Sequence, residues 1–242
     1  MMYLNERIDD LQRGGLRVIQ RADAFRFGTD AVLLADFAAP RRHDRVCDLG
    51  TGTGIIPLLL YARENTISAD AVEIQPDMAD MAARSMAMNG LNEKIRVLSG
   101  DLRSIRTLLP HARYDLVTCN PPYGKAGGTL LNPDASKRLA RHEESCAIED
   151  VACAAAWLLQ NGGRLCCVFP AARMIELSDA MRKYRMAPKR IRMVHSRVEK
   201  VAHLCLMEGM LDARPGLIIE PPLVIYDENN AYTPELRRIY GL

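Results

Sequence analysis

The stretch RVCDLGTGTGII, from Arg45 to Ile56, decides the fold that this sequence predicts. Its first five residues form a short apolar run typical of a buried strand, and glycines follow at positions 50, 52 and 54 before a helical pattern begins. Glycine admits positive φ angles and lets a ligand approach the backbone closely. Open α/β sheets bind ligands at such a point, where a strand ends and the chain turns into a helix. The stretch therefore predicts an α/β fold with a nucleotide-like cofactor at the tip of this strand.

The spacing of the glycines indicates which cofactor to expect. A dinucleotide fingerprint, G-x-G-x-x-G, would need glycine at position 55 or 57, and the chain has Ile55 and Pro57 there. The pattern is instead D-x-G-x-G-x-G, and a carboxylate beside the loop suits a ligand with a positive amino group better than a pyrophosphate. S-adenosylmethionine has such a group. The candidate cofactor residues in this stretch are Asp48, Gly50, Thr51, Gly52 and Gly54.

Short apolar runs alternate with segments of helical period, which is typical of βαβ units in a mostly parallel sheet with helices on both faces. The expected strands cover residues 45–49, 69–74, 95–99, 114–119 and 164–169, with helices at 55–64, 76–90 and 147–163. A further helix through residue 184 and two strands at 189–197 and 203–210 follow. We expect these two strands to form a reversed hairpin at the edge of the sheet.

With 242 residues and 48% hydrophobic content, the chain is expected to form one domain. We divide it into an N-terminal cap segment (1–44), a core (45–210) and a C-terminal extension (211–242). The extension is expected to hold an extended stretch that crosses the core and a short terminal helix. The N-terminus lacks the pattern of a secretion signal and no run of about 18 apolar residues occurs, so we expect a cytoplasmic protein without membrane contact.

The seven cysteines include no C-x-x-C pair. Four of them, Cys47, Cys119, Cys166 and Cys167, lie in apolar runs that read as strands. We expect buried, reduced thiols, with no disulfide and no metal site.

Acidic residues also follow the next two expected strands. Glu73 ends the second strand, where a carboxylate can accept hydrogen bonds from both ribose hydroxyls of a nucleoside. Asp101 lies just past the third strand, where it could accept a hydrogen bond from the adenine amino group. One acid at a strand end is more often solvated or a helix cap. Acids at three successive strand ends favour a cofactor site.

The fourth expected strand ends in Asn120, Pro121, Pro122 and Tyr123, and the prolines fix φ and cannot donate backbone hydrogen bonds. An amide or exocyclic amino nitrogen is a poor nucleophile because its lone pair is delocalised. The Asn120 side-chain oxygen and the Pro121 carbonyl can accept its hydrogens and aim the lone pair at a methyl group. Tyr123 offers a flat ring on which a flipped base can stack. The alternative is a stiff turn without a catalytic role.

With this glycine loop and N-P-P-Y, the sequence resembles the class I S-adenosylmethionine-dependent methyltransferases that modify planar amino nitrogens. The segments FRFGTDAVLLADFA (25–38) and EPPLVIYDENNAYTPE (220–235) make it similar to the tRNA (adenine-N6)-methyltransferase family that acts beside the anticodon of a valine tRNA. The resemblance implies a Rossmann-like seven-stranded sheet with a reversed last strand. It also implies that Phe27, Gly28 and Thr29 cover the cofactor. Residues 124–144 are rich in glycine and long enough to form a substrate-facing loop. For Phe27, a hydrophobic plug is an equal alternative.

Positive charge is concentrated in one segment, although the net charge of the chain is only +2. Residues 182–200 hold eight Lys or Arg against one Glu, which is typical of a surface that binds a phosphate backbone. We therefore predict that tRNA docks on Arg182, Lys183, Arg185, Lys189, Arg190, Arg192 and Arg197. The alternative is a charged surface that only prevents aggregation. The sequence leaves open whether the chain is a monomer or a homodimer.

Other functions stay open at this point. Enzymes that methylate protein glutamines use the same clamp but carry a large helical N-terminal domain, and only about 40 residues precede the first expected strand here. A DNA adenine methyltransferase would need a target-recognition region that the sequence does not reveal. Methylation of an rRNA base is a further alternative, although guanine-N2 enzymes tend to have phenylalanine in place of Tyr123. A non-catalytic RNA-binding protein is expected to have lost the clamp or the glycine loop, and both are intact.

Overall fold

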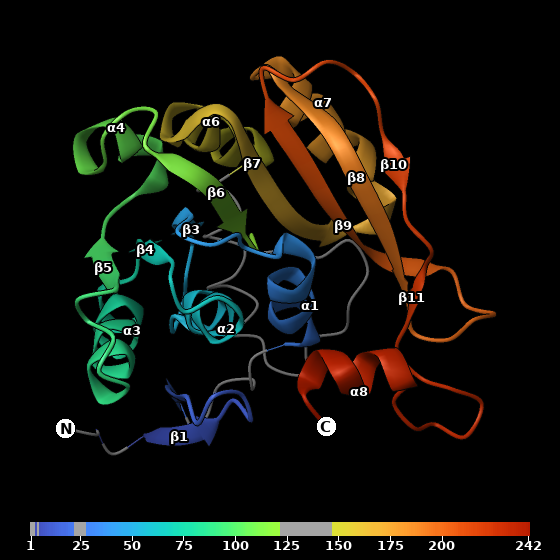
Figure 1. Ribbon diagram of the computed structural model, residues 1–242, viewed down its shortest axis with the longest axis horizontal. Coiled ribbons are helices and arrows are strands. Elements are labelled where there is room, and N and C mark those ends of the chain that lie inside the picture. The colour runs from blue at the N-terminus through green and yellow to red at the C-terminus, as the bar shows by residue number, and fades with distance from the viewer. Residues whose placement is uncertain (1–2, 4, 22–27, 122–146) are drawn as a thin grey trace, which may run out of the picture.

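The computed structural model describes residues 3, 5–21, 28–121 and 147–242. They form three layers, with a central sheet between two groups of helices (Figure 1). The predicted mixed α/β architecture with a mostly parallel sheet is confirmed. None of the helices in these ranges is both long and apolar enough to cross a bilayer.

Seven long strands make up most of the sheet, in the order β5-β4-β3-β6-β7-β9-β8. Strands β3 to β7 are parallel, and β9 runs antiparallel between β7 and β8. The bounds are β3 Arg45–Leu49, β4 Ser68–Glu73, β5 Ile95–Ser99, β6 Tyr114–Cys119, β7 Leu159–Pro170, β8 Met186–His195 and β9 Ala202–Leu211. The parallel strands end at one common edge, here called the carboxyl edge, and the glycine loop lies there at the end of β3.

The predicted reversed hairpin is formed by β8 and β9, with β8 on the outside. Two short strands, β10 (Ile218–Ile219) and β11 (Leu223–Val224), pair in parallel with β8, so the described part of the sheet has nine strands rather than seven. The C-terminal extension therefore follows the outer edge of the sheet instead of crossing the core, because its backbone finds hydrogen-bond partners along β8. It ends in the predicted terminal helix, α8 (Pro234–Tyr240).

Each face of the sheet has its own group of helices (Figure 1). One face packs against α1 (Thr29–Ala38), α2 (Ile55–Arg63) and α3 (Pro76–Met88), and the other against α4 (Ile105–Leu108), α6 (Ile148–Leu158) and α7 (Met174–Lys183). Short 3-10 turns, η1 (Leu102–Ser104) and η2 (Ala171–Arg173), precede α4 and α7. The four cysteines predicted to lie in strands, Cys47, Cys119, Cys166 and Cys167, are buried as predicted.

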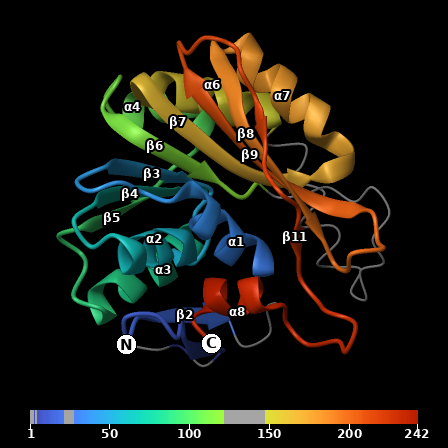
Figure 2. The same cartoon turned by 45° about the vertical axis from the view of Figure 1, so that its right-hand side comes forward.

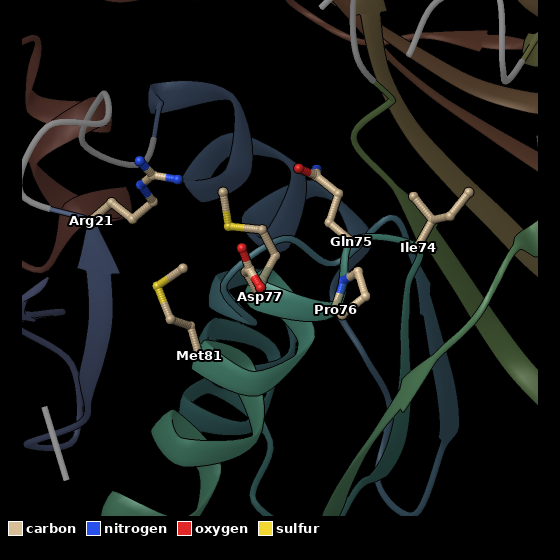
Figure 3. A pocket seen from close by; sticks show the side chains of 7 residues that line it. Arg21, Ile74, Gln75, Pro76, Asp77 and Met81 are labelled. Atoms are coloured by element: carbon tan, nitrogen blue, oxygen red, sulfur yellow. The ribbon is translucent and has the colours of Figure 1, made fainter. Parts of the chain in front are cut away.

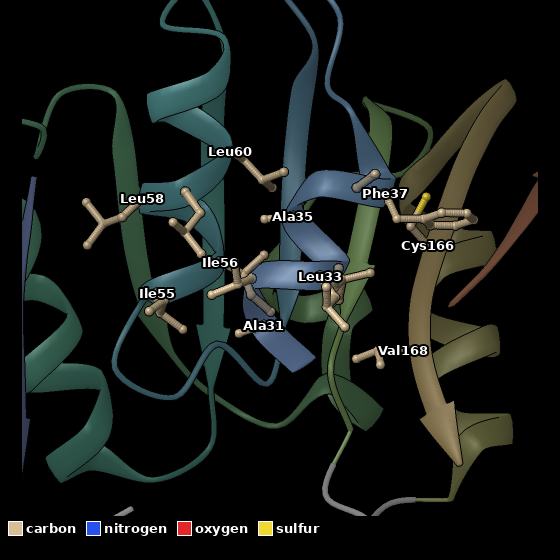
Figure 4. Close-up of a cluster of buried hydrophobic side chains, with 14 of the residues drawn as sticks. Ala31, Leu33, Ala35, Phe37, Ile55, Ile56, Leu58, Leu60, Cys166 and Val168 are labelled. Carbon is tan, nitrogen blue, oxygen red and sulfur yellow. The ribbon is translucent and has the colours of Figure 1, made fainter. Parts of the chain in front are cut away.

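The core between α1 and α2 fixes the position of the glycine loop. Leu33 of α1 and Leu58 and Leu60 of α2 are almost fully buried against the sheet (Figure 4). Burial of a leucine side chain contributes about 1.5–3 kcal/mol. Because α2 begins directly after the loop, this packing holds the loop against the end of β3.

The boundary between α6 and β7 differs from the prediction. The sequence predicts helix as far as residue 163, but α6 ends at Leu158 and β7 begins at Leu159. Gly162 and Gly163 lie within the strand, where the pairing with β6 shifts its register between Tyr114 and Leu116. Glycines are as compatible with a β-bulge as with the end of a helix, so the local sequence does not distinguish the two.

The structure also contains an N-terminal hairpin that the sequence analysis does not assign. It consists of β1 (Glu6–Asp10) and β2 (Arg17–Arg21), and it packs on α3, where the Ile19 N–H donates to Ser85 Oγ at 2.9 Å. Helix α8 lies beside it (Figure 2), and the Arg13 guanidinium donates to the Arg238 carbonyl at 2.7 Å. The two ends of the chain thus meet on the α1–α3 face of the sheet.

Candidate active site

Asp48 in β3 is fully buried beneath the glycine loop. Its Oδ1 accepts a hydrogen bond of 2.6 Å from Thr118 Oγ1 on the neighbouring strand β6. Burial raises the pKa of Asp48 to about 7; the charge of Glu73 acts in the same direction, and the hydroxyls of Thr118 and Thr51 oppose it. A positive charge nearby would stabilise this carboxylate, because it would replace part of the hydration that the carboxylate has lost.

Two polar atoms under the loop make no hydrogen bond of normal geometry within the described part of the chain, although the Thr51 hydroxyl is close enough to Asp48 to lower its pKa. They are Asp48 Oδ2 and Thr51 Oγ1, and both are buried. An unpaired buried polar atom costs on the order of 1–3 kcal/mol, so such atoms call for an explanation such as a ligand that supplies the missing partner. A carboxylate oxygen and a hydroxyl at one place fit a positively charged amino group. The residues present therefore fit the cofactor that the sequence predicts.

The backbone of the glycine loop has room for a ligand, and the N–H groups of its first three residues are bonded within the chain. The N–H groups of Gly50 and Thr51 donate to the Val72 carbonyl at 2.9 and 3.0 Å, and that of Gly52 donates to Glu73 Oε2 at 2.8 Å. A pyrophosphate-binding loop would leave such donors for the ligand. The φ angles of Gly50 and Gly52 are 71° and 57°, and a Cβ on either would meet open space. The open space over Gly50 and Gly52 lets a ligand approach the backbone closely.

Glu73 joins the glycine loop to the start of α3. It is buried at the end of β4, and its Oε1 accepts a hydrogen bond of 2.9 Å from the Gln75 N–H while its Oε2 is bound to the Gly52 N–H. Each carboxylate oxygen has a second lone pair. The carboxylate can therefore hold these two segments together and still accept hydrogen bonds from a ligand.

Two adjoining cavities lie at the carboxyl edge of the sheet. The first has a volume of about 220 Å³, and the predicted residues Gly28, Gly50, Thr51, Gly52 and Asn120 all line it. It therefore brings the glycine loop, the start of α1 and the end of β6 to one place. Asp48 lies beneath this wall rather than in it, so its charge acts on a ligand through Thr51 and the loop.

The second cavity has a volume of about 360 Å³ and lies over the start of α3 (Figure 3). Ile74 and Gln75, just after β4, form one side, and Arg21 reaches over it from the end of β2. The two cavities share Arg21 and Met78. Together they extend from Asn120 past the glycine loop to Ile74, and this elongated space suits a ligand made of an amino acid and a nucleoside.

The sequence does not mark several residues that line these cavities, among them Gln20, Arg21 and Met78. Gln20 and Arg21 belong to the unassigned N-terminal hairpin, and Met78 of α3 lines both cavities. Arg21 is the only lysine or arginine among the described residues that line either cavity. The Gly-Gly pair at 14–15 could have indicated the hairpin turn, but no local signal indicates that the hairpin packs over the site.

Gly54 and Thr29, both predicted to bind the cofactor, do not line either cavity. Gly54 has a φ of 83° at the start of α2 and faces α3, where a Cβ would lie 2.5 Å from Met86 Cε. The Thr29 hydroxyl accepts a hydrogen bond of 3.2 Å from the Tyr240 hydroxyl of α8. Both residues instead position neighbouring elements of the site.

Asp101 likewise lies outside both cavities. It caps η1 by accepting a hydrogen bond of 2.9 Å from the Arg103 N–H, and its Oδ2 pairs with the Arg103 guanidinium at 2.5 Å. These contacts with Arg103 lower the pKa of Asp101. In this structure its carboxylate is therefore bound to Arg103 rather than directed at the cofactor space.

The predicted clamp is described as far as Pro121. Asn120 lies just beyond β6 in the wall of the first cavity, and Pro121 is buried. The other predicted residues, Pro122, Tyr123 and Phe27, and the loop at 124–144, lie outside the described residues. The structure thus brings Asn120 to the same cavity as the glycine loop, and this juxtaposition is needed to place an amine next to a bound cofactor.

The predicted basic surface is largely neutralised by carboxylates. Ion pairs of 2.6–3.0 Å join Lys183 to Glu149, Arg185 to Asp212, Arg190 to Glu208 and Glu220, and Arg192 to Glu235. These cations present less net charge to a phosphate than the sequence indicates, because each has an acid beside it. Arg197 and Lys189 differ, since their hydrogen-bond partners are neutral: the Asp227 carbonyl and the Asn230 amide oxygen for Arg197, and the Arg214 carbonyl for Lys189.

The fold and the site together define a class I S-adenosylmethionine-dependent methyltransferase. The seven long strands have the order of that class, and the residues at the carboxyl edge fit its cofactor. The model of the methyltransferase small domain family matches residues 22–190.

Individual proteins that are similar to this chain are also named as methyltransferases. A tRNA1(Val) (adenine(37)-N6)-methyltransferase of Porphyromonas gingivalis is 32% identical over 231 residues, which are 91% of this chain and 89% of the relative. Another of the same name, from Tolumonas auensis, is 34% identical over 216 residues, 88% of this chain and 86% of the relative. The crystal structure of a predicted O-methyltransferase from Agrobacterium tumefaciens has a TM-score of 0.73 at 24% identity, covering 88% of this chain and 96% of that one. The chain belongs to the methyltransferase small domain family, and within it to the group of these tRNA adenine-N6-methyltransferase relatives.

Proposed function

We propose that this chain transfers the methyl group of S-adenosylmethionine to N6 of an adenine in tRNA. The observation that carries the proposal is that Asn120 and the glycine loop line one cavity. The relatives described above support the substrate, because their name specifies adenine 37 of tRNA1(Val). The protein would then act in the cytoplasm, where tRNA is found.

The cofactor would be held mainly by polar groups under and around the glycine loop. Thr51 Oγ1 would receive its amino group, with the charge of the Asp48 carboxylate acting from beneath the loop, and Glu73 would accept hydrogen bonds from its ribose hydroxyls. Gly50 and Gly52 leave space for close approach to the backbone. When bound, S-adenosylmethionine supplies a reactive methyl group on a positively charged sulfur.

Other residues near the two cavities would complete the cofactor site. Arg21 would bind the carboxylate of the cofactor, since it is the one cation among the described lining residues and the carboxylate is the one anionic group of the ligand. Gly28, with Phe27 and Thr29, would close the space from the N-terminal side of α1. Asp101 would reach the adenine amino group only by giving up its contact with Arg103.

Asn120 and Pro121 would orient the target amine. The Asn120 side-chain oxygen and the Pro121 carbonyl each accept one N–H of the amine, which turns its lone pair out of conjugation and towards the cofactor space. Pro122 would stiffen this turn, and Tyr123 would stack on the target base. The nitrogen releases its extra proton to water after methylation, so the chain needs no side chain that acts as a strong base.

The experiment that tests this function uses tRNA from cells that lack the protein. The purified chain is incubated with this tRNA and S-adenosylmethionine carrying a labelled methyl group, and the nucleosides are identified by mass spectrometry after digestion. We expect labelled N6-methyladenosine with the wild-type chain and none with Asn120→Ala. Label in ribosomal RNA or in protein glutamine, but not in tRNA, would contradict the proposal.

A further inference from the structure

Three tyrosine rings form a stacked ladder in the C-terminal extension. Tyr226 and Tyr232 have ring centroids 5.5 Å apart at an interplanar angle of 28°, and Tyr232 and Tyr240 are also 5.5 Å apart at 17°. At the inner end, the Tyr240 hydroxyl is hydrogen-bonded to Thr29, the first residue of α1. The preceding residue, Gly28, lines the same cavity as Asn120. The ladder therefore leads from the wall of the candidate active site to the surface.

The outer ring of the ladder is exposed and held in place. Tyr226 is 37% exposed, and its backbone bridges that of Tyr232 across a tight turn. The Asp227 carboxylate fixes this turn by accepting the N–H groups of Asn229 and Ala231, each at 2.9 Å. A ring fixed in this way loses little conformational entropy when a planar group stacks on it.

Tyr226 lies at the carboxyl edge of the sheet. Strand β11 ends two residues before Tyr226 and pairs in parallel with the last residues of β8. The Tyr226 N–H then donates to the carbonyl of Ser196, the residue that follows β8, at 2.9 Å. Both β7 and β8 are antiparallel to β9, so β8 ends at the same edge as β6, where Asn120 lies. By the same topology, Arg182, Lys183 and Arg185 lie before the start of β8, at the opposite edge.

Arg197 lies next to Tyr226 and adds a positive charge to the surface around the Tyr226 ring. Its guanidinium is held by the Asp227 carbonyl and by Asn230, which are neutral groups of the same turn. In formal charge, Glu199, Asp227 and Glu228 outweigh Arg197 and Lys200 in this part of the surface. Stacking should therefore carry more of the binding at this surface than charge does.

We propose that Tyr226 and Arg197 form the docking surface for single-stranded nucleotides of the RNA substrate, with a base on the Tyr226 ring and a phosphate on Arg197. This inference rests on the proposed function and, of the predicted basic residues, assigns the substrate contact to Arg197, together with Tyr226. Aromatic rings bind single-stranded bases without sequence preference, and an arginine with neutral partners retains its full charge for a phosphate. An unpaired anticodon loop is substrate of this kind.

The test compares variants by their affinity for the unmodified anticodon stem-loop of tRNA1(Val), made by transcription. We expect Tyr226→Ala to weaken binding by about 5-fold to 100-fold, whereas Tyr226→Phe, which keeps the ring, stays within about 2-fold of wild type. Arg197→Ala should weaken binding and reduce its salt dependence by about one phosphate contact. Arg182→Ala, which removes the same charge at the opposite edge, is the matched control and should have little effect.

Three further measurements distinguish a loss of RNA contact from a loss of cofactor binding or of folding. Affinity for S-adenosylmethionine should be the same for Tyr226→Ala as for wild type, and the melting temperature should fall only by the few degrees expected from losing the stacking on Tyr232. Photocrosslinking of wild type to the stem-loop, which needs no variant, should place crosslinks on the peptide that contains Tyr226. Wild-type affinity of Tyr226→Ala, or crosslinks confined to other peptides, would overturn the inference, whereas failure of the wild-type chain to methylate tRNA would instead overturn the proposed function.

Discussion

Thr118 Oγ1 donates a hydrogen bond of 2.6 Å to Asp48 Oδ1, and the two residues face each other in the parallel pairing of β6 and β3. Asp48 lies under the glycine loop, and Thr118 lies two residues before Asn120. This contact joins the part of the site that would hold the cofactor to the part that would hold the amine. It also leaves Asp48 Oδ2 without a partner, so the folded chain contains a buried carboxylate that is only half satisfied.

Replacement of this carboxylate should stabilise the chain in the absence of cofactor. The pKa of Asp48 is about 7 in the fold and near 3.8 when unfolded, so the folded state binds more protons between these values. Its contribution to the free energy of unfolding therefore falls as pH rises from about 4 to about 7. We expect Asp48→Asn to raise stability at pH 8 by on the order of 2 kcal/mol, measured by urea unfolding. Equal gains at pH 4 and pH 8 would contradict this account.

The same carboxylate should make cofactor binding depend on pH. A bound ammonium group favours the ionised form of Asp48, so binding at pH 7 should release part of a proton. Calorimetry in two buffers of different ionisation enthalpy measures this release directly. Affinity should fall as pH drops from about 8 to about 6 and the Asp48 carboxylate becomes protonated. The Asp48→Asn variant is the control: proton release that persists in it must come from another group.

Arg21 should recognise the carboxylate of the cofactor. Loss of one charge-assisted hydrogen bond corresponds to about 10-fold in affinity, so we expect Arg21→Ala to weaken binding of S-adenosylmethionine by about that factor. The decarboxylated analogue lacks the group that Arg21 would bind, and its affinity should be the same for variant and wild type. If Arg21→Ala weakens both ligands equally, Arg21 supports the cavity wall without contacting the carboxylate.

Replacement by alanine should mainly lower stability at Gly54 and mainly weaken cofactor binding at Gly52. Both have positive φ angles, but a Cβ at Gly54 would meet Met86 Cε at 2.5 Å and Ala82 Cβ at 3.2 Å, whereas a Cβ at Gly52 would meet open space. Gly54→Ala should therefore lower stability by about 1–3 kcal/mol, and the smaller loss in Gly52→Ala should be accompanied by weaker cofactor binding. Thermal unfolding with and without cofactor separates the two effects. An equal loss of stability in both variants would show that strain in φ dominates over packing.

The positions of the core strands along the chain could be predicted from the sequence because each buried parallel strand is a local apolar run. The expected ranges 45–49, 95–99 and 114–119 coincide with β3, β5 and β6. The start of β7 could not be predicted, because the glycines at 162–163 are compatible both with a β-bulge and with the end of a helix. The edge strands β10 and β11 were missed because their two residues become strands only by pairing with β8.

Some residues of the candidate site could likewise be predicted from the sequence, and others could not. Asp48, the glycines and Asn120 could be found because strand ends meet at one edge whatever the details of packing. Arg21 could not, since its place depends on the contact between Ile19 and Ser85, which are far apart in sequence. The basic surface shows the opposite error: its charges are in the sequence, but the acids that pair with them, such as Glu149 and Asp212, come from other parts of the chain.

The most direct test of the central claim is a single-turnover measurement of methyl transfer to the tRNA1(Val) stem-loop by wild type and Asn120→Ala, both saturated with S-adenosylmethionine. If Asn120 orients the amine, the rate constant should fall by about 100-fold or more, while the dissociation constant of the cofactor changes by less than about 3-fold. An unchanged rate constant would contradict the account, and so would a loss of rate that is fully explained by a loss of cofactor binding.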